Sequence, residues 1–196
     1  MSSGSPRPLR IAFGGRMQVG KTTAADHLVE RHAFVKRAFA DPIKRIACDA
    51  YGWDGAKDAR GRRLLQEIGS VGRRYDPDLW LKRLSTRLAS DGSPRVVVDD
   101  VRLAREVACL EGLGFACVRI LRSPALISTR LADQAREQHE TETELDAVHF
   151  AHTIRNDGSF TELYMALDDL VAAVDRSMSE EPEEIGGSEK PKGPAA

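Results

Sequence analysis

Cysteine is scarce in this sequence, and the few that are present form no pattern. Cys48, Cys109 and Cys117 are the three cysteines among 196 residues. Their odd number and wide spacing argue against a disulfide framework and against a zinc site built on short cysteine spacings. We therefore expect reduced, mostly buried thiols in a cytosolic protein.

Long apolar runs are missing as well. No stretch approaches the roughly 20 consecutive apolar residues that a membrane-spanning helix requires. The segment from Met1 to Arg10 is rich in Ser, Gly and Pro and lacks the apolar core of a signal peptide. These absences lead us to expect a protein of the cytoplasm without a membrane partner.

The sequence also lacks a large net charge of either sign. Its 29 Lys and Arg residues and 30 Asp and Glu residues give a formal net charge of -1 at pH 7. This balance gives no reason to expect nucleic acid or an anionic membrane as a partner, although it is compatible with a local basic cleft. With 41% hydrophobic residues, a chain of 196 residues is most simply one globular domain with a sizeable core.

The most informative segment that is present is a glycine-rich loop. Residues 15–22 read Gly-Arg-Met-Gln-Val-Gly-Lys-Thr and fit the phosphate-loop pattern G-x-x-x-x-G-K-[ST] at every fixed position. The apolar run from Leu9 to Phe13 predicts a buried strand before the loop, and Thr22 to His32 predicts a helix after it. Free amides at such a helix start point toward a bound anion, so the pattern predicts a nucleoside triphosphate site.

Each part of this loop has an expected chemical role. Lys21 is expected to reach the β- and γ-phosphates, and the hydroxyl of Thr22 is expected to ligate Mg²⁺. The residues expected to contact the triphosphate are Gly15, Val19, Gly20, Lys21, Thr22 and Thr23.

Strand and helix patterns alternate along the chain, which predicts an α/β three-layer sandwich with a mainly parallel sheet. Helix 41–51 is expected to have Asp41 as its N-cap and Pro42 as its first residue. From Ser177 the composition changes to Glu, Pro, Gly, Ser and Lys, which predicts a disordered tail over 177–196 after a domain over 9–176 and a flexible start over 1–8. Further strands are expected within 33–40 and at 95–99, 115–121 and 148–154. Further helices are expected at 59–73, 78–89 and 102–113, and behind a Ser159–Glu162 capping box. A polar, basic helix and loop is expected over 124–140.

A second candidate site follows the apolar run Val96-Val97-Val98, which ends in Asp99 and Asp100. A carboxylate at the end of such a strand can hold the magnesium shell or position an attacking oxygen. Both acids are therefore candidate metal ligands, and we expect Asp100 to matter more; the alternative is that they only open a surface turn. Arg102 and Glu106 follow, either as substrate contacts or as an ordinary surface pair four residues apart.

The remaining motifs separate classes of phosphate-loop protein. The sequence has no Asn-Lys-x-Asp and no separate Asp-x-x-Gly motif, which argues against a switch GTPase. Arginines on a mobile lid can neutralise a transferring phosphoryl group, and we expect one or two of eight candidates to do so. These eight are Arg60, Arg62, Arg63, Arg73, Arg74, Arg122, Arg130 and Arg136.

Six segments together resemble phage-type deoxynucleoside monophosphate kinases, over about residues 11–170. They are Phe39-Ala40-Asp41-Pro42-Ile43-Lys44, Arg63-Leu64-Leu65-Gln66-Glu67-Ile68-Gly69, Asp76-Pro77-Asp78-Leu79-Trp80, Asp99-Asp100-Val101-Arg102, His139-Glu140-Thr141-Glu142 and Asn156-Asp157-Gly158. The resemblance implies a five-stranded parallel sheet with a helical substrate-binding insertion at about 41–90 and a lid at about 122–145. It also implies ATP- and Mg²⁺-dependent phosphorylation of deoxynucleoside monophosphates to diphosphates, in the host cytoplasm if a phage encodes the chain.

The resemblance also implies roles for individual residues. The expected catalytic residues are Lys21 and Asp100, together with Arg122 and Arg130 from the lid candidates named above. The expected substrate residues are Asp41, Lys44, Arg63, Gln66, Trp80, Arg102, Glu106 and Glu142. Thr22 stands where the family often has Asp, and it is the more usual magnesium ligand. The run from Leu103 to Glu106 replaces a Phe-Pro-Asn-Glu-like sequence, which leaves the base preference open.

Three alternatives are compatible with the same motifs. Phosphomevalonate kinase of the animal type shares a phosphate loop, a Pro-Leu-Lys-like helix start and an Asp-x-Arg turn, and dephospho-coenzyme A kinase is a more distant candidate. A non-catalytic nucleotide-binding regulator is the third. Small molecules are the expected partners in each case, and a homodimer is one option for the assembly.

Overall fold

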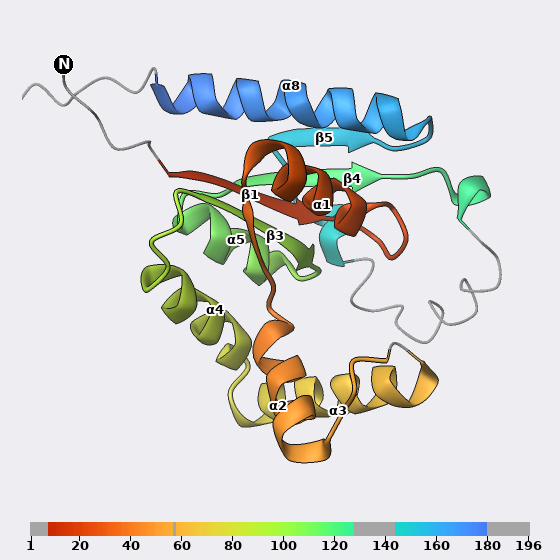
Figure 1. Cartoon of the computed structure of the whole chain (residues 1–196), viewed down its shortest axis with the longest axis vertical. Coiled ribbons are helices and arrows are strands. Elements are labelled where there is room, and N and C mark those ends of the chain that lie inside the picture. Colours follow the sequence, from red (N-terminus) through yellow and green to blue (C-terminus); the bar gives the residue numbers. More distant parts are fainter. Residues whose placement is uncertain (1–7, 57, 128–143, 180–196) are drawn as a thin grey trace, which may run out of the picture.

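A five-stranded parallel sheet lies at the centre of the fold (Figure 1). The computed structural model describes residues 8–56, 58–127 and 144–179. The strands lie in the order β2-β3-β1-β4-β5, which places the phosphate-loop strand β1 in the middle. Their bounds are β1 (Leu9–Gly14), β2 (Val35–Arg37), β3 (Arg95–Val101), β4 (Ala116–Leu121) and β5 (His152–Arg155).

Helices cover both faces of this sheet. Helix α1 (Lys21–His32) and helix α8 (Phe160–Ser179) cover one face, and α4 (Leu79–Ala89) and α5 (Ala104–Gly112) cover the other. Helices α2 (Asp41–Tyr51) and α3 (Ala59–Tyr75) lie at the end of the molecule opposite α8 (Figure 1). Two short 3-10 helices, η1 (Pro124–Leu126) and η2 (Glu144–Ala147), complete the described elements.

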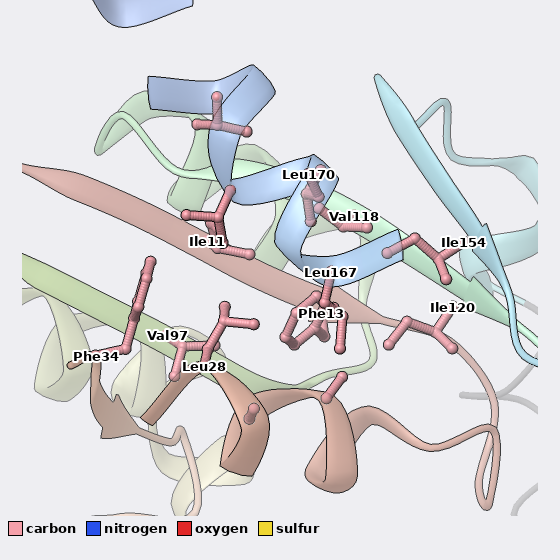
Figure 2. Close-up of a cluster of buried hydrophobic side chains, with 14 of the residues drawn as sticks. Ile11, Phe13, Leu28, Phe34, Val97, Val118, Ile120, Ile154, Leu167 and Leu170 are labelled. Atoms are coloured by element: carbon pink, nitrogen blue, oxygen red, sulfur yellow. The ribbon is translucent and has the colours of Figure 1, made fainter. Parts of the chain in front are cut away.

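The alternation of side chains along the strands divides the buried core between the two faces. Figure 2 shows Leu28 of α1 and Leu167 of α8 gathered with Phe13 of β1 on the first face. Val97 of β3 belongs to this cluster, whereas its neighbours Val96 and Val98 belong to the cluster under α4 and α5. The same alternation decides where the polar residues at the end of β3 point.

The predicted α/β sandwich with a parallel sheet is confirmed, and so is the capping box at the start of α8. The amide of Ser159 donates to Glu162 Oε2 at 2.7 Å, and the amide of Glu162 donates to Ser159 Oγ at 3.3 Å. No helix among the described residues is long and apolar enough to cross a membrane.

Several predicted boundaries need correction. Helix α2 begins at Asp41 with Ala40 as its N-cap, because the Asp41 carboxylate turns back to accept from the amide of Ala38 at 2.9 Å. Strand β3 continues to Val101, so α5 begins later than expected, and β5 begins four residues late, at His152. Helix α8 reaches Ser179 and includes the start of the expected tail, while residues 180–196 lie outside the described residues.

The cysteine prediction holds in part. Cys48, Cys109 and Cys117 are all free, and Cys117 is buried. Cys109 is partly buried, but Cys48 is exposed on α2, so the expectation of mostly buried thiols is wrong for that residue.

Candidate active site

The phosphate loop joins β1 to α1, and its two fixed glycines are required by its geometry. Gly15 has φ +142° and Gly20 has φ +103°, both in the region that favours glycine. A Cβ atom on Gly15 would lie 2.4 Å from the carbonyl oxygen of Ile120, and one on Gly20 would lie 2.4 Å from Asn156 Nδ2. No side chain can be added at either position without moving a neighbour.

Lys21 points back into the loop that precedes it. Its ammonium lies 2.5 Å from the carbonyl oxygen of Gly15 and 2.7 Å from that of Arg16, and the residue is only 9% exposed. Thr22 is exposed at the first turn of α1 and Thr23 is half-buried, while Val19 is buried beneath the loop. The loop therefore brings together all six residues predicted to contact the triphosphate.

Asn156 is a loop residue that the sequence did not assign to the site. Its Nδ2 donates to the carbonyl oxygen of Val19 at 2.8 Å, and its own amide donates to the carbonyl of Leu121 at 2.8 Å. Asn156 is 7% exposed and follows β5, so it fixes the phosphate loop to the neighbouring edge of the sheet. The motif Asn156-Asp157-Gly158 was a signal for this position, but nothing in the motif indicated which backbone atom it binds.

The two acids at the end of β3 point to opposite faces of the sheet. Asp99 lies on the α1 side, where its Oδ2 is 2.9 Å from Lys36 Nζ. The same ammonium lies 3.0 Å from Asp26, one helical turn after Thr22 in α1. Burial opposes the charge on Lys36, but its hydrogen bonds to Asp99 and Asp26 prevail and raise its pKa. Asp99 therefore lies on the same side of the sheet as the first turn of α1, which contains Thr22.

Asp100 points to the α2 side and binds the backbone there. Its carboxylate accepts from the amides of Phe39 at 3.0 Å and Ala40 at 2.9 Å. Burial raises the pKa of Asp100 to about 6, even though these two amides favour its charged form. Asp100 therefore fixes the corner between β2 and α2, and the expectation that it is the main metal ligand of the pair is not supported by this arrangement.

Glu106 and Arg102 do not form the surface pair that their spacing allows. The carboxylate of Glu106 accepts from the backbone amides of Arg102 at 2.7 Å and Leu103 at 3.1 Å, which caps the start of α5. Burial raises the pKa of Glu106 to about 7, and the nearby charge of Asp100 adds to this effect. The side chain of Arg102 is exposed next to this cap.

The helical insertion at about 41–90 carries most of the expected substrate residues. Their side chains are exposed to solvent, with one exception. Lys44 lies 3.6 Å from Asp41 on α2, and both side chains are 44% exposed. Arg63 on α3 pairs with Glu67 at 2.9 Å, and Gln66 lines an open depression of about 450 Å³ on the same helix. These residues can contact a solute from solvent.

Trp80 is the exception among them. It is 7% exposed, and its Nε1 donates to the carbonyl of Gly69 at 3.0 Å. A Cβ atom on Gly72 would lie 2.2 Å from the Trp80 ring, so the indole fills the space between α3 and α4. Trp80 packs α3 against α4 in this structure, and its expected substrate contact stays a prediction.

Basic groups lie near the loop on strand β4 and on the loop itself. Arg16 pairs with Asp146 of η2 at 2.6 Å, and Arg119 pairs with the same carboxylate. These interactions hold the pKa of Asp146 below its usual range. Arg122 is half-buried just after β4, and its Nε makes no hydrogen bond within the described part of the chain. Arg130 and Glu142, also expected in the site, lie outside the described residues.

No protein-family model matches the chain, but curated proteins of large viruses do. It is 33% identical over 178 residues to "Uncharacterized protein ORF76" of Ictalurid herpesvirus 1 (strain Auburn), a match that covers 88% of this chain and 69% of that protein. It is 31% identical to "Uncharacterized protein ORF77" of the same virus, covering 76% of this chain and 64% of that protein. The chain thus spans about two thirds of the length of these two relatives.

A third relative has a functional name. The chain is 26% identical to "Putative deoxynucleotide monophosphate kinase" of Acanthamoeba polyphaga mimivirus, a match that covers 85% of this chain and 96% of that protein.

Solved structures share the fold at low sequence identity. TT1252 from Thermus thermophilus superposes with a TM-score of 0.54 at 17% identity, covering 85% of this chain and 98% of that one. A structure described as a "putative kinase" from Chloroflexus aurantiacus superposes with a TM-score of 0.50 at 16% identity, covering 90% and 98%. At these identities the likeness concerns the fold alone.

Proposed function

The chain belongs to the family of the Ictalurid herpesvirus 1 protein ORF76, and we propose that it transfers the γ-phosphoryl group of ATP to a deoxynucleoside 5′-monophosphate. The observation that carries this proposal is the phosphate loop, with Lys21 folded into it and Thr22 exposed at the start of α1. The name of the mimivirus relative supports the choice of acceptor. The order of the six sequence motifs supports the same choice.

The loop residues would hold the triphosphate of ATP. The amides at the start of α1 point toward a bound anion, and Lys21 would exchange the carbonyls of Gly15 and Arg16 for phosphate oxygens. Such an exchange replaces neutral acceptors by charged ones, which form stronger hydrogen bonds. Asn156 keeps the loop in shape through Val19 while this happens.

The structure offers oxygen ligands that suit Mg²⁺. The hydroxyl of Thr22 is exposed, and the carboxylate of Asp99 lies on the α1 side, linked through Lys36 to the turn that follows Thr22. Mg²⁺ prefers such hard oxygen ligands and keeps several waters. We propose Thr22 and Asp99 as the residues that hold it, and its role is to neutralise charge on the β- and γ-phosphates. Asp100 would instead hold the segment between β2 and α2, next to the acceptor, through the amides of Phe39 and Ala40.

The acceptor would lie against the insertion at about 41–90. An acceptor phosphate is itself a nucleophile near neutral pH, since the second pKa of a phosphate monoester is about 6, so no strong general base is required. The protein's task is then to align the acceptor and neutralise its charge. We propose Asp41, Lys44, Arg63, Gln66 and Arg102 as acceptor contacts, with Arg122, Arg130 and Glu142 contributed from a lid at about 122–145.

We propose that the enzyme works in the cytoplasm on small molecules, without nucleic acid or membrane. A homodimer is compatible with this function, and light scattering at assay concentration measures the assembly.

A coupled assay of ADP release tests the proposed activity. Each common deoxynucleoside monophosphate, the matching ribonucleotides and phosphomevalonate are offered with ATP and Mg²⁺, and Lys21→Ala serves as the inactive control. We expect turnover with at least one deoxynucleotide and slower turnover with its ribonucleotide. Efficient turnover of phosphomevalonate, with none of any deoxynucleotide, would overturn the acceptor assignment and keep the phosphotransfer. Lack of turnover with every acceptor, together with tight ATP binding, would instead indicate a nucleotide-binding regulator.

A further inference from the structure

A second chemically distinctive group of side chains lies toward the far end of α1 from the phosphate loop. His27 and His32 of α1 and Asp168 of α8 each offer a ligand atom, and these atoms all lie within 4.8 Å of one another. We propose that this His-Asp cluster binds a divalent transition-metal ion, with Zn²⁺ as the expected ion. At 1.5 Å per residue, the two histidines lie about 9 and 16 Å along α1 from Lys21, so the cluster is separate from the proposed ATP site.

The two imidazoles converge on one carboxylate oxygen. His27 Nε2 lies 2.8 Å from Asp168 Oδ1, and His32 Nε2 lies 2.6 Å from the same atom. A zinc ion with bonds of about 2.0–2.1 Å keeps its ligand atoms about 3.3 Å apart in a tetrahedron, so the nitrogens of His27 and His32 would move about 0.5 and about 0.7 Å away from the oxygen. The two nitrogens already lie within 4.8 Å of each other and would approach each other as the ion binds.

The surrounding elements hold the ring of His27 and the backbone of His32 in place. The ring of His27 stacks on Tyr164 at 4.2 Å between centroids and 5° between planes, and Tyr164 lies one helical turn before Asp168. The carbonyl of His32 accepts from Arg95 of β3 at 3.2 Å, and His32 is the last residue of α1, followed by the C-cap Ala33 with φ +56°. Three packed elements therefore preorganise the ligands, as effective metal sites require.

The ligand set and its exposure favour zinc over the magnesium that ATP chemistry uses. Two imidazole nitrogens and one carboxylate oxygen suit Zn²⁺ and its transition-metal neighbours, whereas Mg²⁺ prefers oxygen ligands alone. The side chains of His27, His32 and Asp168 are 12%, 20% and 40% exposed, so an ion can enter from solvent and keep water as a fourth ligand.

A bound ion would join two helices that are distant in sequence. Helix α1 begins at the phosphate loop, and α8 packs beside it over the same face of the sheet (Figure 2). An ion that binds the folded chain alone raises its apparent stability by mass action. We therefore expect Zn²⁺ to stabilise the domain without taking part in phosphoryl transfer.

Titration of the full chain with Zn²⁺ tests this site, with thermal unfolding as a second readout. All samples carry Cys48→Ser, because that exposed thiol is an alternative ligand, and contain millimolar Mg²⁺ to occupy oxygen-rich sites. We expect a single bound Zn²⁺ and a raised melting temperature. His32→Gln keeps an N–H donor for Asp168 but removes the imidazole, and should weaken Zn²⁺ binding at least about tenfold. The exposed His149→Gln is the matched control and should bind as the parent does.

Two results would overturn the metal site. Equal Zn²⁺ affinity in the parent and in the His27→Gln/His32→Gln double variant would place the ion elsewhere. A lower melting temperature in the variants, with no effect of Zn²⁺ on the parent, would show that the cluster only links α1 and α8 by hydrogen bonds. If the variants fail to fold, the parent alone still decides, because bound Co²⁺ must give the intense visible absorption of a four-coordinate site.

Discussion

The phosphate loop and the helical insertion are built in opposite ways. The loop rests on the buried core, with Val19 and Lys21 among its buried residues, and it offers mainly backbone groups to a ligand. In the insertion, α3 is mostly exposed, and the residues that it buries are Gly61, Gly69 and Gly72. Its side chains are therefore the groups that a ligand meets.

This difference matches the chemistry of the two proposed substrates. A triphosphate always presents the same charged oxygens, so a rigid backbone site of fixed shape suits it. An acceptor nucleotide presents a base and a sugar that vary, so contacts through exposed side chains such as Lys44 and Arg63 can change without disturbing the sheet. We therefore expect the loop to bind the triphosphate and the insertion to bind the acceptor.

The largest effect is expected from Lys21→Ala in the loop. Loss of the ammonium should lower kcat by a factor on the order of 10³ or more, because a group that stabilises the transferring charge is removed. The fold should survive, since the melting temperature depends mainly on the core. Coupled kinetics and thermal unfolding measure the two quantities, with the exposed Lys82→Ala as a control for the loss of a surface charge. Near-normal turnover in a folded Lys21→Ala would contradict the kinase proposal.

The next largest effect separates the two acids at the end of β3. Asp99→Asn should lower kcat by a factor on the order of 10² or more with little change in stability, because Asp99 lies on the α1 side. Asp100→Ala should instead destabilise the fold by about 1–3 kcal/mol, since the amides of Phe39 and Ala40 lose their acceptor. Mg²⁺-dependent kinetics and denaturant unfolding of both variants measure this. If Asp100 had the larger effect on kcat and none on stability, the two roles would be exchanged.

A smaller effect is expected from Asn156, which follows β5 and binds the backbone of the phosphate loop. Asn156→Ala leaves the buried carbonyl of Val19 without its donor, which should cost about 1–2 kcal/mol of stability. Because the loop loses its support, the KM for ATP should rise several-fold while the KM for the acceptor stays the same. Asp157→Ala is the control, since Asp157 binds Ser123 at the surface and makes no contact of this kind with the loop in the described structure. An equal rise in both KM values would mean that the two regions are not independent.

The smallest effect concerns pH and the cap of α5. The pKa of Glu106 is raised from 4.5 to about 7, so its ionisation costs the folded state free energy and stability falls as the pH rises through this window. In Glu106→Gln the amide oxygen still accepts from Arg102 and Leu103, but this pH dependence is removed. The melting temperature of the variant, relative to that of the parent, should therefore rise as the pH increases from about 4.5 to about 7. Parallel curves over that range would show that Glu106 is not the responsible carboxyl.

The phosphate loop could be predicted from the sequence, whereas most roles of individual side chains could not. The pattern from Gly15 to Thr22 determines a loop conformation, because only glycine tolerates the positive φ at Gly15 and Gly20. The alternation of strand and helix patterns likewise predicted the parallel sheet, but not the order of its strands. Local pattern and elementary sterics are sufficient for these features.

The roles of Asp99 and Asp100 show where such reasoning ends. Both follow the same apolar strand, and only the alternation of β3 together with the positions of α1 and α2 decides which face each acid meets. The same is true of Trp80, whose indole fits against Gly72 of another helix. Spacing along the chain carries no information about these long-range contacts, so the sequence did not indicate which backbone amides Asp100 binds or that Trp80 packs on Gly72.

Phosphoryl transfer from ATP to a deoxynucleotide can be measured by following the phosphoryl group itself. ATP labelled in its γ-phosphoryl group is incubated with the protein, Mg²⁺ and each deoxynucleoside monophosphate, and the products are separated by chromatography. We expect label in the β-phosphoryl position of at least one deoxynucleoside diphosphate, and none when Lys21→Ala replaces the parent. Label that stays in ATP, or that appears only in inorganic phosphate, with every deoxynucleotide would contradict the proposed transfer.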